Sequence, residues 1–225
     1  MHIEPGLVDG AKITLSYATA TGALGYTAKV AWDMVKTDGA ASLAIRSVMT
    51  TLMVFAYFQV LPHHPVGVSE VHLIMGSTLF LLFGAAPAAI GLAAGLLLQG
   101  LLFAPIDLPQ FGMNVTSLLV PLFAMAVIAK KIIPAKTAYK DVSYTQALQL
   151  STLYQGGIVT WVMFWAFYGQ GFGAANVASV LAFGAAYMTV VIVEPLVDLA
   201  VLAGVKTLHG LKDSGAFEKR LFAAA

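Results

Sequence analysis

Long apolar stretches, separated by short segments rich in proline, glycine or charge, dominate this sequence. A membrane-spanning helix needs about 20 apolar residues, because each residue advances the helix by about 1.5 Å and the hydrocarbon layer is about 30 Å thick. Seven stretches approach this pattern, with the third and fourth the shortest: 7–35, 43–61, 72–83, 88–103, 113–133, 147–168 and 177–205. The pattern predicts about seven transmembrane helices in a single domain covering residues 1–225.

The segments between these stretches carry residues that interrupt helices. Prolines and glycines mark 62–67, 84–87, 104–112 and 169–173, whereas 134–143 is polar and basic. Proline fixes the backbone φ angle and lacks an N–H group, so we expect loops or turns there. Ten-residue segments of alternating polarity, which are typical of outer-membrane barrels, do not occur. The sequence therefore indicates an all-α, polytopic membrane protein.

Composition supports this class. Of the 225 residues, 59% are hydrophobic and 10% are charged, whereas soluble domains usually carry about 25% charged residues. The net charge of +1 gives no reason to expect a nucleic-acid partner. The sequence has no cysteine, so any metal site must use nitrogen or oxygen ligands.

The distribution of Lys and Arg predicts the orientation, because these residues favour the cytoplasmic side. With seven helices, three basic regions fall on one side: Lys29, Lys36 and Arg46; Lys130, Lys131, Lys136 and Lys140; and Lys206, Lys212, Lys219 and Arg220. We therefore expect the N-terminus outside and the C-terminus inside. Four of the five histidines then lie towards the outer face.

The chain opens with Met1-His2, a pair with its own metal chemistry. The terminal amine, the amide nitrogen of His2 and its Nδ1 can form two adjoining chelate rings on one ion. His72 is the candidate fourth ligand, and a planar set of four nitrogens suits Ni(II) or Cu(II) and tolerates Co(II). The first residues lack the basic region of a signal peptide, so we expect an uncleaved N-terminus. The alternative is that Met1 is only the start residue and His2 is solvated.

Other residues near the outer face are candidates for supporting roles. Side chains that orient ligand imidazoles are commonly hydrogen-bonded to them, and four are predicted here: Ser69, Gln99, Asn114 and Thr116. Asn114 is the best of these; the competing interpretation is ordinary helix capping, for which Asn is a preferred residue.

Three further outer-face residues are candidates for an access funnel that draws cations to the site: His63, His64 and Asp107. The competing interpretation of each is an ordinary solvated loop residue.

Glu194 and Asp198 lie four residues apart on one face of the last helix. Carboxylates within membrane segments are rare and often functional. We consider a contact with a partner subunit, a proton relay, or an acid paired with Lys206. The proton-relay interpretation makes the chain a proton-coupled secondary transporter of a small solute or cation.

Three motifs resemble the CbiM and NikM family of membrane proteins that capture cobalt or nickel. They are the opening Met1-His2-Ile3 with Gly6, the segment 65–76 around His72, and the segment 98–114 that contains Gln99 and Asn114. The resemblance covers roughly the first 125 residues. Two departures stand out: the family commonly has an acidic residue directly before the early glycine, whereas Pro5 precedes Gly6 here and Glu4 comes earlier, and His72 follows Glu70-Val71, where small or polar residues are more usual.

The resemblance implies the S component of an energy-coupling factor (ECF) transporter in the bacterial cytoplasmic (inner) membrane. It implies metal ligation by the N-terminal amine, His2 and His72, with Co(II) or Ni(II) as the transported ligand. The implied partners are a transmembrane coupling subunit, two ATP-binding subunits and, in some systems, a small auxiliary membrane subunit. The chain has no GxxxxGK[ST] motif, and it has no GxSxG or HExxH motif. We therefore expect a transporter subunit and not an enzyme; a structural subunit without a ligand is the remaining alternative.

Overall fold

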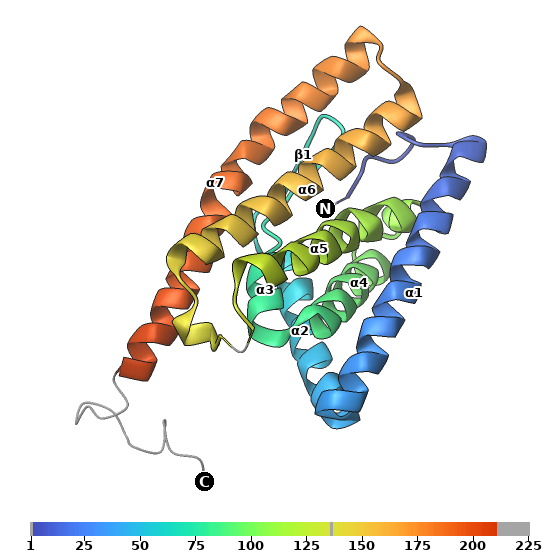
Figure 1. Ribbon diagram of the computed structural model, residues 1–225. Coiled ribbons are helices and arrows are strands. Elements are labelled where there is room, and N and C mark those ends of the chain that lie inside the picture. Colours follow the sequence, from blue (N-terminus) through green and yellow to red (C-terminus); the bar gives the residue numbers. More distant parts are fainter. Residues whose placement is uncertain (1, 136, 211–225) are drawn as a thin grey trace.

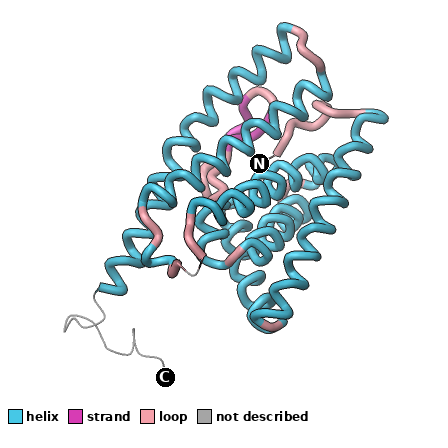
Figure 2. Tube along the Cα trace, viewed as in Figure 1, coloured by secondary structure: helices cyan, strands magenta, loops and turns pink. Residues whose placement is uncertain are grey.

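The computed structural model describes residues 2–135 and 137–210, and these form a helical bundle (Figures 1 and 2). Met1, predicted as a ligand, lies outside the described residues, as do four residues used for orientation: Lys136, Lys212, Lys219 and Arg220. The helices are α1 (Ile13–Asp38), α2 (Ala40–Val60), α3 (Gly76–Phe83), α4 (Ala85–Leu102), α5 (Phe111–Ile132), α6 (Tyr144–Gln170) and α7 (Ala174–Gly210). Short 3-10 turns η1 (Gly10–Lys12), η2 (Pro105–Gln110) and η3 (Tyr139–Asp141) precede α1, α5 and α6.

The prediction of an all-α membrane protein is confirmed. Within the described residues, four helices are long and apolar enough to span a membrane: α2, α4, α5 with η2, and α7. Helices α1 and α6 have 26 and 27 residues, which is sufficient length at about 1.5 Å per residue, but they are more polar. Helix α3 has only 8 residues and extends about 12 Å, so it cannot span a bilayer alone.

The third apolar stretch differs most from its prediction. The helix was expected from residue 72 but begins at Gly76, and residues 72–75 are non-helical. A short hairpin, β1 (His64–Val66) paired antiparallel with β2 (Ser69–Val71), precedes it in place of the predicted loop. Gly67 makes the hairpin turn with φ 62°, and a Cβ atom there would collide with the backbone of Ser179 on α7. The hairpin is therefore pressed against α7.

Carboxylates of α7 hold the start of α3. The backbone N–H groups of Ile74 and Met75 both donate to Glu194 Oε1. The hydroxyls of Ser77 and Thr78 donate to Asp198. Buried backbone N–H groups need partners, and a carboxylate also suits the positive end of a helix. These bonds explain why the chain leaves the helical path at 72–75, where Met75 has a left-handed conformation with φ 59°.

Helix α4 begins earlier than expected. Pro87 was predicted to belong to a turn, but it lies in the first turn of α4, where an N–H group has no intrahelical partner to lose. Gly84, with φ 91°, makes the turn instead. Similarly, the segment with two prolines after α4 contains η2 and is not a simple loop.

Close packing of α2 against α4 depends on two glycines. A Cβ atom at Gly95 would lie 2.6 Å from Val54 Cγ1, and one at Gly91 would collide with Thr50. The Gly91-x-x-x-Gly95 motif therefore serves packing within the chain, as small residues commonly do between membrane helices.

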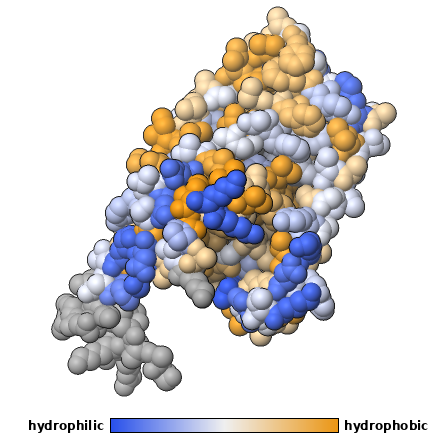
Figure 3. Space-filling view, viewed as in Figure 1, coloured by the Kyte–Doolittle hydropathy of each residue, from blue (hydrophilic) through white to orange (hydrophobic). Residues whose placement is uncertain are grey.

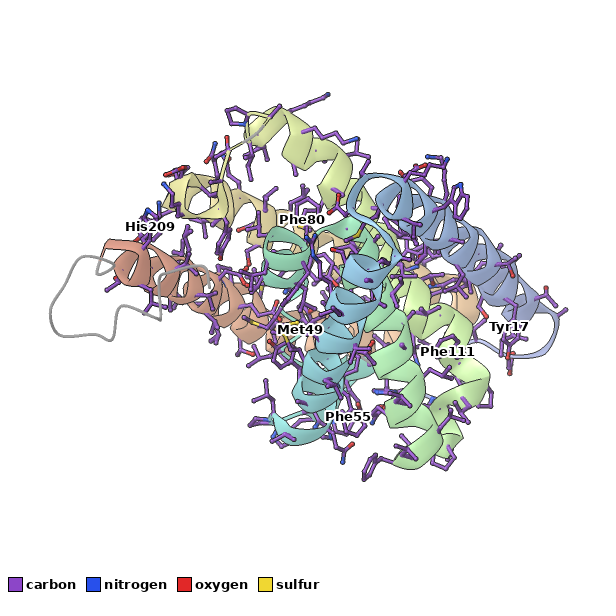
Figure 4. The ribbon with its side chains drawn as sticks, turned by 90° about the horizontal axis from the view of Figure 1, so that it is seen from below. Tyr17, Met49, Phe55, Phe80, Phe111 and His209 are labelled. Atoms are coloured by element: carbon purple, nitrogen blue, oxygen red, sulfur yellow. The ribbon has the colours of Figure 1, made fainter. Side chains whose placement is uncertain are left out.

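The ends of the bundle differ in character. Figure 1 shows the α1–α2 turn and the end of α7 at the bottom and the α6–α7 turn at the top. In Figure 3, hydrophobic residues cover the upper end over α6 and α7, and most hydrophilic residues gather in the lower half. Figure 4 shows Tyr17 at the edge of the bundle, where its hydroxyl donates to the Pro109 carbonyl at 2.8 Å. The seven helices correspond in chain order to the seven predicted apolar stretches. Which end of the bundle faces the cytoplasm stays a prediction.

We predict that Glu194→Ala destabilises the chain. The substitution leaves the amides of Ile74 and Met75 without an acceptor, at about 1–3 kcal/mol for each buried unpaired group. Thermal unfolding in detergent should show a clear fall in midpoint. Leu196→Ala, at a position 60% exposed on the same helix, is the control and should change the midpoint far less. Equal effects of the two substitutions would contradict the anchoring role.

Candidate metal centre

The N-terminal segment lies against the β1–β2 hairpin as an added strand. Ile3 forms a β-bridge with Ser69. The Glu70 N–H donates to the His2 carbonyl at 2.8 Å, and the Glu4 N–H donates to the Val68 carbonyl at 3.1 Å. These bonds fix the backbone of His2 relative to β2, which leads directly to His72.

Two of the predicted supporting residues hold this strand. The Ser69 hydroxyl donates to the His2 carbonyl at 2.9 Å, and the Ile3 N–H donates to Asn114 Oδ1 at 2.8 Å. Asn114 is therefore bonded to a distant segment and does not cap α5 with its side chain. Both residues position the backbone next to His2, whereas the prediction was that they would bond to imidazoles.

The structure brings His2 and His72 together. Their ring centroids lie 5.6 Å apart, and their exposed fractions are 3% and 1%. Glu70 joins them: potential ligand atoms of His2, Glu70 and His72 all lie within 4.8 Å of one another. Sequence reasoning gave Glu70 no role in the site. The clue in the sequence was the spacing of two residues between Glu70 and His72, because residues two apart in an extended strand face the same side.

Three buried imidazole nitrogens have no hydrogen-bond partner among the described residues: Nδ1 and Nε2 of His2, and Nδ1 of His72. The Nδ1 of His2 lies 3.0 Å from Asp107 Oδ2, a contact that becomes an ion pair only when the imidazole is protonated. The Nε2 of His72 lies 2.7 Å from Glu70 Oε2. Buried polar atoms are normally paired, so nitrogens without partners are suited to receiving a ligand.

Burial lowers the pKa of both imidazoles. Loss of hydration is the main cause for His2 and for His72, and the pKa of His72 falls well below its usual 6.5. For His2, the nearby Asp107 opposes the shift without reversing it. A metal ion requires a neutral imidazole, and burial favours that form.

Acidic side chains surround the approach to His2. A groove is lined by His2 together with Glu4, Glu70 and Asp107. Negatively charged carboxylates that line a concave surface raise the local concentration of cations. The location of Asp107 thus fits the predicted access funnel.

The two neighbouring histidines differ in position. His63 stacks on His72 with ring centroids 5.0 Å apart and an angle of 6° between the planes. His64 begins β1 and lines a separate hollow that also borders His72. Their role in cation access stays a prediction.

Two other predicted orienting residues are placed differently. The Thr116 hydroxyl donates to carbonyls of its own helix and accepts from the Trp161 indole at 3.1 Å. Gln99 is buried, and its Oε1 has no partner among the described residues. Among the described residues, no hydrogen bond joins the side chain of Gln99 or Thr116 to His2 or His72.

Glu194 and Asp198 face the interior. Their exposed fractions are 0% and 2%, and both accept hydrogen bonds from the start of α3. They therefore offer no surface to a partner subunit in this conformation. Lys206 does not pair with them; its ammonium donates to the Lys140 carbonyl at 2.6 Å.

A sequence model of the family described as "Cobalt uptake substrate-specific transmembrane region", CbiM, matches residues 2–209. The chain belongs to the CbiM family. The resemblance found in the motifs around His2, His72 and Asn114 is thereby confirmed. A comparison with curated proteins found no match.

Two solved structures share the CbiM chain's fold. One is described as a truncated transition metal transporter: it is 16% identical, with a TM-score of 0.66, and the match covers 93% of this chain and 98% of that one. The other, described as a transition metal transporter, is 18% identical, with a TM-score of 0.64 and coverage of 99% and 100%. At these identities the likeness establishes the fold alone.

We predict that acid destabilises the metal-free chain through His72. Because the pKa of His72 is lowered in the folded state, the unfolded chain takes up the proton first as pH falls below about 6.5. The stability contributed by the neutral imidazole is therefore present above that pH and is lost below it. Unfolding in detergent at pH 7.5 and pH 5 should show a smaller loss for His72→Gln than for the native chain. Substitution of the exposed His209 is the control, and an unchanged loss in His72→Gln would contradict the prediction.

Proposed function

We propose that this chain captures Co(II) or Ni(II) as the substrate of an ECF-type importer in the bacterial cytoplasmic membrane. The observation that carries the proposal is the meeting of two buried imidazoles, His2 and His72, with three ring nitrogens lacking partners. Membership of a cobalt-uptake family supports metal as the class of substrate.

The proposed ligands are the N-terminal amine of Met1, the nitrogens of His2 and an imidazole nitrogen of His72. In the structure His2 Nδ1 lies beside Asp107. Chelation through Nδ1 and the terminal amine thus requires the His2 ring to leave that carboxylate when the ion binds. Cobalt is the slight preference, because the matching family is described by cobalt uptake.

Energy for import would come from partner subunits, namely a transmembrane coupling protein and two ATP-binding proteins, with or without a small auxiliary membrane subunit. In this scheme the N-terminal strand and hairpin close over the ion, and the partners drive the change that releases it inward. Mutation of the nucleotide-binding motifs in the partners should then abolish metal accumulation in cells.

Purified chain should bind about one Co(II) or Ni(II). Two variants should each weaken binding by at least about 10-fold: a chain with one residue added before Met1, and His72→Ala. Each variant removes a proposed ligand or chelate ring. Calorimetry or competition with a coloured chelator measures this, and competition between the two ions ranks them. His209→Ala removes a histidine far from the site and should bind as the native chain does. Native affinity in the extended chain would show that the amine is not a ligand.

A further inference from the structure

Glu70 is tied to both histidines of the candidate metal centre. Its backbone N–H donates to the His2 carbonyl at 2.8 Å. Its carboxylate Oε2 lies 2.7 Å from His72 Nε2. One residue of β2 thus connects the N-terminal strand to the imidazole of the segment that follows.

The chemistry of this contact determines the tautomer of His72. An ionised carboxylate only accepts hydrogen bonds, so Nε2 must carry the proton that it donates to Glu70. In a neutral imidazole the lone pair then belongs to Nδ1. The Nδ1 of His72 is buried and has no partner among the described residues.

We propose that Glu70 is a positioning residue that holds His72 with Nε2 protonated and Nδ1 presented to the metal ion. The proposal rests on the proposed metal capture and adds the nitrogen that binds and the residue that selects it. A carboxylate bonded to the far nitrogen of a metal-binding imidazole fixes the ring and increases its basicity, and losing such a partner typically lowers metal affinity 10–100-fold.

The hydrogen bond is shielded enough to act in this way. The His72 side chain is 1% exposed and that of Glu70 is 24% exposed, so water competes little at the imidazole. The His63 ring stacks on the His72 ring with nearly parallel planes, and this contact restricts rotation of the His72 ring. The carboxylate also adds a negative charge beside an ion of charge +2.

Three variants separate positioning from charge. Glu70→Ala removes both the acceptor and the charge, and Glu70→Gln keeps an oxygen acceptor for Nε2–H but removes the charge. Asp9→Asn is the matched control, because Asp9 is an exposed carboxylate of the same N-terminal segment and does not line the groove. Co(II) and Ni(II) affinities are measured for each, with X-ray absorption of the bound ion and ¹⁵N spectra of the labelled histidines in the metal-free chain.

We expect Glu70→Ala to lower affinity about 10–100-fold, Glu70→Gln to recover part of that loss, and Asp9→Asn to change affinity by less than about 3-fold. The ¹⁵N signals of His72, identified by their loss in His72→Ala, should show protonated Nε2 in the native chain and a mixture of tautomers in Glu70→Ala. Bound metal should keep the same number of ligands in all variants.

Several results would overturn the proposal. Native affinity in Glu70→Ala, or equal losses in all three variants, would remove the positioning role. Loss of an oxygen ligand in Glu70→Ala would make Glu70 a direct ligand. A native His72 protonated at Nδ1 would reverse the assigned nitrogen. Because the ¹⁵N experiment uses the metal-free chain, it tests Glu70 even if the native protein binds no metal, which would refute only the proposed function.

Discussion

The bonds between the α7 carboxylates and the start of α3 are the constraint on which the rest of the structure depends. A membrane protein tolerates non-helical backbone in its interior only where other parts of the protein satisfy the N–H and C=O groups. Residues 72–75 are such a stretch, and Glu194 supplies the acceptor for two consecutive amides. Without that acceptor the two buried amides would be unpaired, and the non-helical course of residues 72–75 would lose its main support.

The extended course of β2, which runs directly into His72, creates the site. An extended strand can pair with another strand, and the N-terminal residues use this property when Ile3 and Glu4 bond to the hairpin and to Asn114. His2 is thereby held beside His72. Burial favours the neutral form of both imidazoles, and the surrounding carboxylates give the groove a negative potential that would suit the proposed cation.

The same contacts couple the site to a long helix. His72 lies two residues from the amide of Ile74, and Ile74 bonds to the middle of α7. Movement of α7 relative to α3 would therefore be passed to His72 through a connection of two residues. The partner subunits proposed for transport would have a direct mechanical route to the ligand without touching it.

The sequence alone determined the class of protein and supplied the hypothesis of a metal site. Runs of apolar residues determined the helical membrane fold, because only segments of that length and composition suit a bilayer, and Met1-His2 with His72 indicated metal through the chemistry of nitrogen ligands. The tertiary structure decided what depends on contacts between distant segments. The short α3, the hairpin, the inward-facing Glu194 and Asp198, and the backbone role of Asn114 follow from pairing that no local pattern encodes. Glu70 illustrates the difference between the two levels. Its spacing from His72 is visible in the sequence, but its bond to the imidazole depends on residues 69–72 being extended and not helical.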